Sequence, residues 1–114
     1  MIGQTIVTSA HVVKMVAELA ADTRFESAPA TTHILRGRRL FSCGPAIVAA
    51  GDGSSSADAT IVRVQWRALA RVAGDDVYQA GFASRDELAE ALGLTQPSDA
   101  VTVVEVEYPR LWSA

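Results

Sequence analysis

Hydrophobic and polar residues alternate over residues 60–68, and this spacing predicts a β-strand. Successive side chains of a strand point to opposite faces. One face is apolar and is expected to lie against the core; it comprises Val62, Val64, Trp66 and Ala68. The other face is polar and basic and is expected to face solvent; it comprises Arg63, Gln65 and Arg67.

Short apolar or alternating runs predict further strands over residues 4–8, 46–50 and 101–108. A short strand over residues 23–26 also fits the pattern. Residues 32–39 fit a helix and a strand equally well.

Two helices are predicted from the spacing of apolar residues. The first follows Ser9, an N-cap residue, and its apolar face comprises Val12, Met15, Val16 and Leu19. The second follows Ser84, which with Glu87 forms a capping box: the serine hydroxyl accepts from the Glu87 amide and the glutamate accepts from the Ser84 amide. Gly93 is expected to end this helix. Its expected apolar face comprises Leu88, Ala91 and Leu92.

The predicted order is β-α-β-β-β-α-β, which indicates an α+β fold: a small curled sheet or β-barrel with two main helices at its ends. A chain of 114 residues has room for one domain, residues 1–114. No apolar run approaches the roughly 18 residues of a membrane span, and the N-terminus lacks the basic region of a signal peptide. We therefore expect a cytoplasmic protein.

The net charge of −3 excludes a uniformly basic nucleic-acid binder, but the charge is unevenly distributed. Residues 1–30 carry a net charge of −1, residues 31–71 carry +4, and residues 72–114 carry −6. The basic middle and the acidic C-terminal third indicate two functional faces. Nine of the ten basic residues are arginines, which is typical of a GC-rich coding genome of actinobacterial or phage type.

Residues 60–108 resemble the second half of an ASCH domain, a small β-barrel of the PUA-like class. The similarity comprises the strand over residues 60–66, a short acidic helical stretch over residues 74–80, and the final strand over residues 101–107. Between them lies the segment Gly81-Phe82-Ala83-Ser84-Arg85-Asp86-Glu87-Leu88, which matches a Gly-Phe-x-Ser-x-x-Glu-Leu pattern. The resemblance implies a PUA-like barrel with a cleft.

The first half of the chain matches this family less well. ASCH domains usually carry a Gly-x-Lys-x-x-Thr-x-Arg-like segment after the first helix, and two registers fit it here. One is residues 37–42, with Arg39 at the lysine position and Ser42 at the threonine position; the other is residues 21–24. Some family members resemble amidohydrolases that act on N4-acetylcytidine through that lysine. Arginine keeps its proton and cannot act as a base, and Lys14, the only lysine, lies in neither register, so we expect no such activity.

Other enzyme motifs are weak. The glycine- and serine-rich residues 51–56 lack the Gly-Lys-Ser/Thr ending of a P-loop and are predicted to connect two strands. Cys43 excludes an internal disulfide because it has no partner, and we expect it to be buried and inert rather than a nucleophile acting with His33. One cysteine and two histidines exclude a Cys₄ or Cys₂His₂ zinc site. We expect no catalytic residues, no metal and no cofactor.

The leading functional hypothesis is an ASCH-like domain that binds RNA or another nucleic acid through phosphate contacts. The candidate contact residues are Arg36, Arg38, Arg39, Arg63, Gln65 and Arg67. Arg63 and Arg67 lie about 13 Å apart along one strand face. Aromatic platforms for bases are scarce, because Trp66 is assigned to the core and leaves Phe41, Tyr78 and Trp112.

Two other functions are consistent with the sequence. The chain fits a non-enzymatic accessory protein, encoded by a phage or another mobile element, whose acidic C-terminal face binds a host protein. It also fits a hydrolase of a modified nucleoside in which Ser42 or Cys43 replaces the missing lysine chemistry. The oligomeric state does not follow from the sequence.

Overall fold

The computed structural model describes residues 4–8, 30–53 and 56–108. The predicted first helix and the predicted strand over residues 23–26 lie outside these ranges, as does the alternative family register at residues 21–24. The described elements are the strands β1 (Thr5–Thr8), β2 (Ala30–Arg36), β3 (Gly44–Ala50), β4 (Ser56–Ala68) and β5 (Ala100–Glu107), the 3₁₀ helix η1 (Leu69–Arg71), and the helices α2 (Gly74–Gln79) and α3 (Arg85–Leu92).

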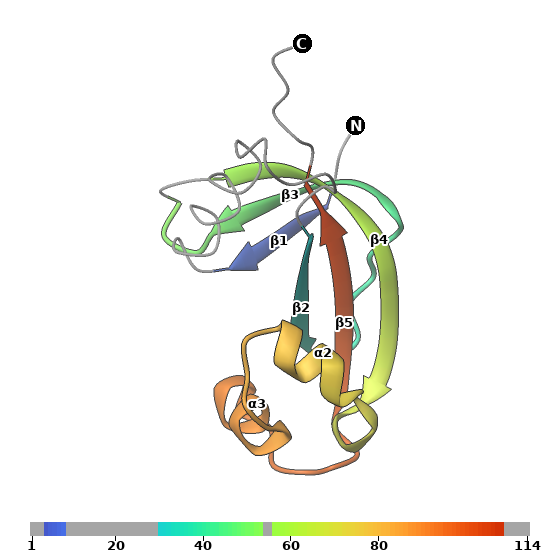
Figure 1. The fold of residues 1–114 in the computed structure, drawn as a ribbon, viewed down its shortest axis with the longest axis vertical. Helices are drawn as coiled ribbons and strands as arrows, with labels where there is room; N and C mark the ends of the chain where they lie inside the picture. Colours follow the sequence, from blue (N-terminus) through green and yellow to red (C-terminus); the bar gives the residue numbers. More distant parts are fainter. Residues whose placement is uncertain (1–3, 9–29, 54–55, 109–114) are drawn as a thin grey trace. The chain divides into compact units, whose positions relative to one another are not determined.

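The strands form a five-stranded mixed sheet in the order β1-β3-β4-β5-β2, and with α2 and α3 they make an α+β fold (Figure 1). The four strands predicted over residues 4–8, 46–50, 60–68 and 101–108 are confirmed with small shifts at their ends. The ambiguous residues 32–39 form most of β2, which ends before Gly37. Gly37 has φ +80°, a left-handed conformation that favours glycine and ends the strand.

The chain divides into two compact units. The described part of the first unit comprises residues 4–8, 30, 43–53, 56–62 and 106–108, and the second unit comprises residues 31–42 and 63–105. In the first unit, β1 runs parallel to β3, and β3 runs antiparallel to the first part of β4. Strand β4 begins four residues earlier than predicted, because residues from Ser56 onward pair with β3 around the turn at residues 51–53. Alternate residues of the three strands are buried: Ile6, Ala46, Val48, Ala50, Ala59 and Ile61.

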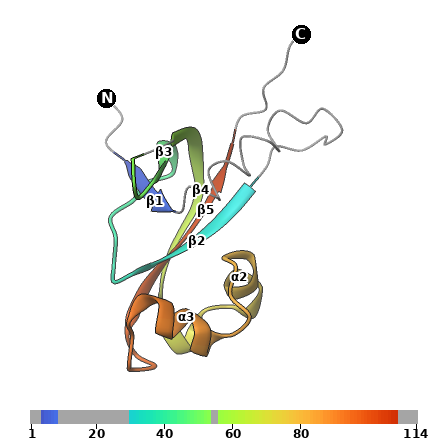
Figure 2. The same cartoon turned by 90° about the vertical axis from the view of Figure 1, so that its left-hand side faces the viewer.

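The second unit holds the two helices at the end of the strands where β4 ends and β5 begins (Figure 1). Figure 2 shows α2 and α3 next to each other at this end. Their apolar sides pack with β2 and β5 residues in one core cluster, which comprises Ile34, Leu69, Val72, Val77, Leu88, Val101 and Val103. No helix of the described residues is both long and apolar enough to cross a membrane.

The start and end of α3 follow the prediction from its capping residues. The Ser84 hydroxyl accepts a hydrogen bond from the Glu87 amide at 3.2 Å, and Gly93 ends the helix in a left-handed conformation with φ +69°. The second half of the predicted capping box is wrong, because the Glu87 carboxylate accepts from the amide of Ala83, at 3.3 Å, instead of that of Ser84.

The predicted apolar face of α3 is partly wrong. Ala91 is exposed, and Ala89 packs against the core with Leu88 and Leu92 instead. The helix has only eight residues, so the apolar pattern covers two turns and does not separate these two alanine positions.

His33 is a buried titratable side chain, and we expect it to make the stability of the protein depend on pH. Its ring Nε2 lies 2.7 Å from the Thr31 hydroxyl, and burial lowers the pKa of His33 below its ordinary value. Since the folded pKa is lower than the unfolded one, the contribution of neutral His33 to stability is complete above about pH 6.5 and is lost as the pH falls through the folded pKa.

We expect the free energy of unfolding of the parent to fall relative to that of His33→Gln between about pH 7 and about pH 5. Urea denaturation at a series of pH values measures both proteins, and carboxylates that titrate in the same range cancel in the difference. A difference that stays constant over this range would contradict the prediction.

Candidate nucleic-acid interface

Trp66 lies at the surface of the second unit, so its predicted core position is wrong. The side chain is 46% exposed, and Val62 on the same predicted face is 40% exposed. The core cluster of the second unit contains no β4 residue. Alternation shows which side chains share a face of a strand but does not show which face the neighbouring elements cover.

The Trp66 indole is held in place by polar contacts with the segment after β2. Its Nε1–H donates to the Arg39 carbonyl oxygen at 2.9 Å, and the guanidinium of Arg38 lies over the ring, 5.7 Å from the centroid. A hollow of about 130 Å³ adjoins this pair and is lined by Arg38, Trp66, Arg67, Ala68, Ser98 and Ala100. The hollow therefore combines an aromatic ring, two guanidinium groups and small side chains.

A larger open groove, of about 620 Å³, is lined by β4, η1, α2 and α3 residues. Its polar lining residues are Arg63, Gln65, Arg67, Arg71, Asp76 and Arg85. Within residues 4–8, 30–53 and 56–108, the side chains of Arg67 and Arg71 make no ion pair or hydrogen bond, and both residues are exposed. Arg85 donates from Nε and Nη2 to the Val72 carbonyl oxygen, which accepts without cancelling the positive charge.

Arg63 differs from the other arginines of the groove because two carboxylates surround it. Its Nη2 and Nη1 donate to the Asp76 carboxylate at 2.7 and 3.3 Å, and its Nε donates to Glu105 at 3.0 Å. The pKa of Arg63 is raised, chiefly by the hydrogen bond to Asp76. Nη1 also donates to the Gln65 side-chain oxygen at 2.9 Å. Arg63 and Gln65, both predicted to contact nucleic acid, are thus engaged within the protein.

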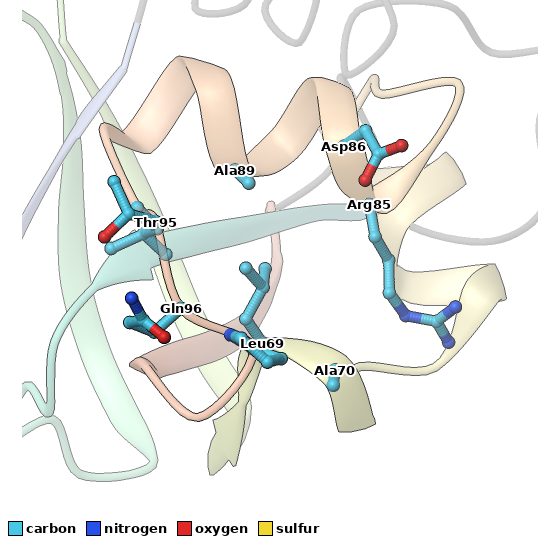
Figure 3. Close-up of a pocket in the computed structure, with 9 residues that line it drawn as sticks. Leu69, Ala70, Arg85, Asp86, Ala89, Thr95 and Gln96 are labelled. Carbon is cyan, nitrogen blue, oxygen red and sulfur yellow. The ribbon is translucent and has the colours of Figure 1, made fainter.

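Figure 3 shows a third depression, of about 270 Å³, between α3 and the segment that leads to β5. Ala89 of α3 faces Leu69 across it, Thr95 and Gln96 lie at one end, and Arg85 lies at the other. Leu94 and Pro97 complete its apolar lining.

The three depressions are joined by shared lining residues. Arg85 and Ala70 line both the pocket of Figure 3 and the open groove, and Arg67 lines both the groove and the hollow beside Trp66. We call the joined surface the arginine track; its arginines without a carboxylate partner among the described residues are Arg38, Arg67, Arg71 and Arg85.

Arg36 and Arg39, the other two predicted contact residues, line none of these three depressions. The side chain of Arg39 donates to the Arg36 carbonyl oxygen at 3.2 Å, and its amide donates to Thr102. The sequence prediction missed Arg71 and Arg85. Arg71 lies just beyond the strand pattern, and Arg85 lies in the acidic third, where averaging over the segment concealed it.

Part of the acidic C-terminal third is used within the fold. Asp76 and Glu105 pair with Arg63. The Asp99 carboxylate accepts from the amides of residues 95 and 96, and Glu87 accepts from the Ala83 amide. Four of the eight carboxylates of residues 72–114 therefore have partners in the second unit, and the positive charge of Arg63 offsets part of the negative charge of two of them.

Cys43, one of the alternative enzyme residues, is placed differently from its prediction. Cys43 is exposed, contrary to its predicted burial, because it lies before β3 rather than within the apolar part of that strand. Cys43 belongs to the first unit, whereas His33 belongs to the second. In the described part of the chain, no group of three or more histidine, cysteine and acidic residues is arranged to hold a metal ion.

Comparisons of the chain with protein-family models, with curated proteins and with solved structures found no significant match. The resemblance to ASCH domains therefore stays a prediction from the residues that carry it.

Proposed function

We propose that this chain is a cytoplasmic ASCH-like domain of the PUA-like class that binds RNA or another nucleic acid along the arginine track. The observation that carries the proposal is the pair Arg67 and Arg71. Both are exposed, both line the open groove, and neither has a carboxylate partner among the described residues. A guanidinium group donates two parallel hydrogen bonds to a phosphate and suits this role better than a point charge.

The shape of the track favours an extended polyanion over a compact ligand. Enclosed, mostly apolar pockets bury most of a small molecule, whereas here an open groove shares lining residues with two further depressions. A nucleic-acid backbone carries a phosphate at every nucleotide, so successive phosphates can contact successive arginines along such a surface. Arg63 lies in the same groove, and we assign it a structural role because its guanidinium is already paired with Asp76 and Glu105.

Replacing Arg67 and Arg71 together with glutamine is expected to weaken RNA binding by about 10- to 100-fold. Each arginine supplies a charge-assisted contact, and each tenfold change corresponds to about 1.4 kcal/mol. A filter-binding titration with an oligouridylate RNA at low salt measures the change. Arg36→Gln/Arg39→Gln is the matched control because it removes the same two charges from exposed residues outside the track, and it is expected to change affinity by less than about twofold.

Equal affinity of the parent and the Arg67→Gln/Arg71→Gln variant would overturn the proposal. In that case the accessory-protein function becomes the better account. It predicts that a protein partner from a host lysate remains bound after nuclease treatment and is lost when the exposed carboxylates Asp75, Asp86 and Glu90 are neutralised.

A further inference from the structure

Trp66 is an exposed aromatic ring with a fixed orientation. The proposed phosphate contacts of the arginine track give this ring no role. The bond from Nε1 to the Arg39 carbonyl oxygen, at 2.9 Å, fixes the direction of the indole edge. Nearly half of the side chain is accessible to solvent. A large aromatic side chain with its polar group satisfied and its apolar surface exposed is an established kind of recognition residue.

The hollow that adjoins Trp66 is the space open to a flat group. Arg38 lies 5.7 Å from the ring centroid, near the outer limit of about 6 Å for a cation–π contact. The remaining residues of the adjoining hollow are Ala68, Ser98, Ala100 and Arg67, of which the first three are small. Bases of single-stranded nucleic acids stack on aromatic rings and on arginine guanidinium planes. The Trp66–Arg38 pair offers both.

Arg67 connects this hollow to the groove, because it lines both. A nucleotide with its base against Trp66 therefore has the guanidinium of Arg67, which has no carboxylate partner within the described ranges, next to the stacking surface for its phosphate. Arg71 lines the same groove for the following phosphate. A base within a duplex is stacked on its neighbours on both sides and cannot offer its face to the indole.

We infer that the arginine track binds single-stranded nucleic acid, with one unpaired base stacked on Trp66 beside Arg38. This inference rests on the proposed function. The ligand class is thereby narrowed from nucleic acids in general to strands or loops with unstacked bases.

The test compares three probes with the same number of phosphates: an oligouridylate, an oligoribonucleotide of the same length that lacks its bases, and a fully paired RNA duplex. The parent is expected to bind the oligouridylate about 5- to 150-fold more tightly than the abasic strand, the range that corresponds to one stacked base. The duplex is expected to bind more weakly than the oligouridylate.

A second readout follows the tryptophan directly. The chain has two tryptophans, so Trp112→Phe leaves Trp66 as the single indole. We expect the oligouridylate to quench Trp66 fluorescence in this background and the abasic strand to leave it nearly unchanged. Trp66→Leu should bind the oligouridylate no better than the parent binds the abasic strand, whereas Trp66→Phe, which keeps a ring, should retain part of the preference.

The outcomes separate the two proposals. Equal binding of all three probes, with no quenching of Trp66, overturns the stacking inference and leaves phosphate binding by the track intact. If none of the three probes binds at low salt, the proposed function fails and this inference fails with it. Preference for the oligouridylate together with quenching supports both.

Discussion

Replacing Leu88 with alanine is expected to lower the free energy of unfolding by about 2–5 kcal/mol. The Leu88 side chain is 0% exposed and belongs to the core cluster of the second unit. Truncation removes buried methyl groups and leaves a cavity that its neighbours fill only in part. Urea denaturation followed by circular dichroism measures the loss.

Leu40→Ala is the matched control because that leucine is 88% exposed, and its expected change is within about 0.5 kcal/mol. Leu88→Met conserves volume and is expected to cost less than about 1.5 kcal/mol, so it reports on the same position if the alanine variant does not fold. Equal changes for Leu88→Ala and Leu40→Ala would contradict the described packing of α3.

Replacing Arg63 with methionine is expected to lower the free energy of unfolding by about 1–3 kcal/mol while leaving RNA affinity within about twofold of the parent. The loss arises because Asp76, with a side chain only 15% exposed, keeps its charge and loses its hydrogen-bonded partner. Methionine retains much of the length and apolar volume of the arginine stem. Denaturation and filter binding measure the two quantities on the same preparations.

Arg67→Met is the matched control, because Arg67 lies on the same strand and lines the same groove but has no partner among the described residues. It should weaken RNA binding and change stability by less than about 0.5 kcal/mol. Adding Asp76→Asn to Arg63→Met should restore part of the stability, because it removes the uncompensated charge. If Arg63→Met weakens RNA binding as much as Arg67→Met does and leaves stability unchanged, Arg63 is a phosphate ligand and the assigned structural role is wrong.

The elements that could be predicted from the sequence are those specified by neighbouring residues. The alternation that predicts β4 involves residues within one strand, and each cap of α3, Ser84 and Gly93, involves residues within one turn. These predictions are confirmed. The ambiguous segment that became β2 shows the limit of such patterns, since its pairing in the sheet decided its conformation.

The candidate site depends on contacts between distant residues and could be predicted only in part. Arg67 and Arg38 were predicted as basic contact residues, and both line the track. Arg63 pairs with Asp76 and Glu105, which lie 13 and 42 positions away from it in the sequence. A local charge pattern contains no information on such pairing. The exposure of Trp66 likewise depends on β2 and β5 forming the core cluster without β4, which alternation within β4 cannot reveal.

The central claim is that arginines of the track bind nucleic-acid phosphates. It is tested most directly by the salt dependence of oligouridylate binding. Each phosphate contact to a single strand contributes about −0.7 to the slope of log affinity against log salt concentration. With three or four contacting arginines the parent should show a slope of about −2 to −3, and Arg67→Gln/Arg71→Gln should show a slope shallower by about 1.4. A parent slope near zero, or the same slope for the parent and this variant, would contradict the account.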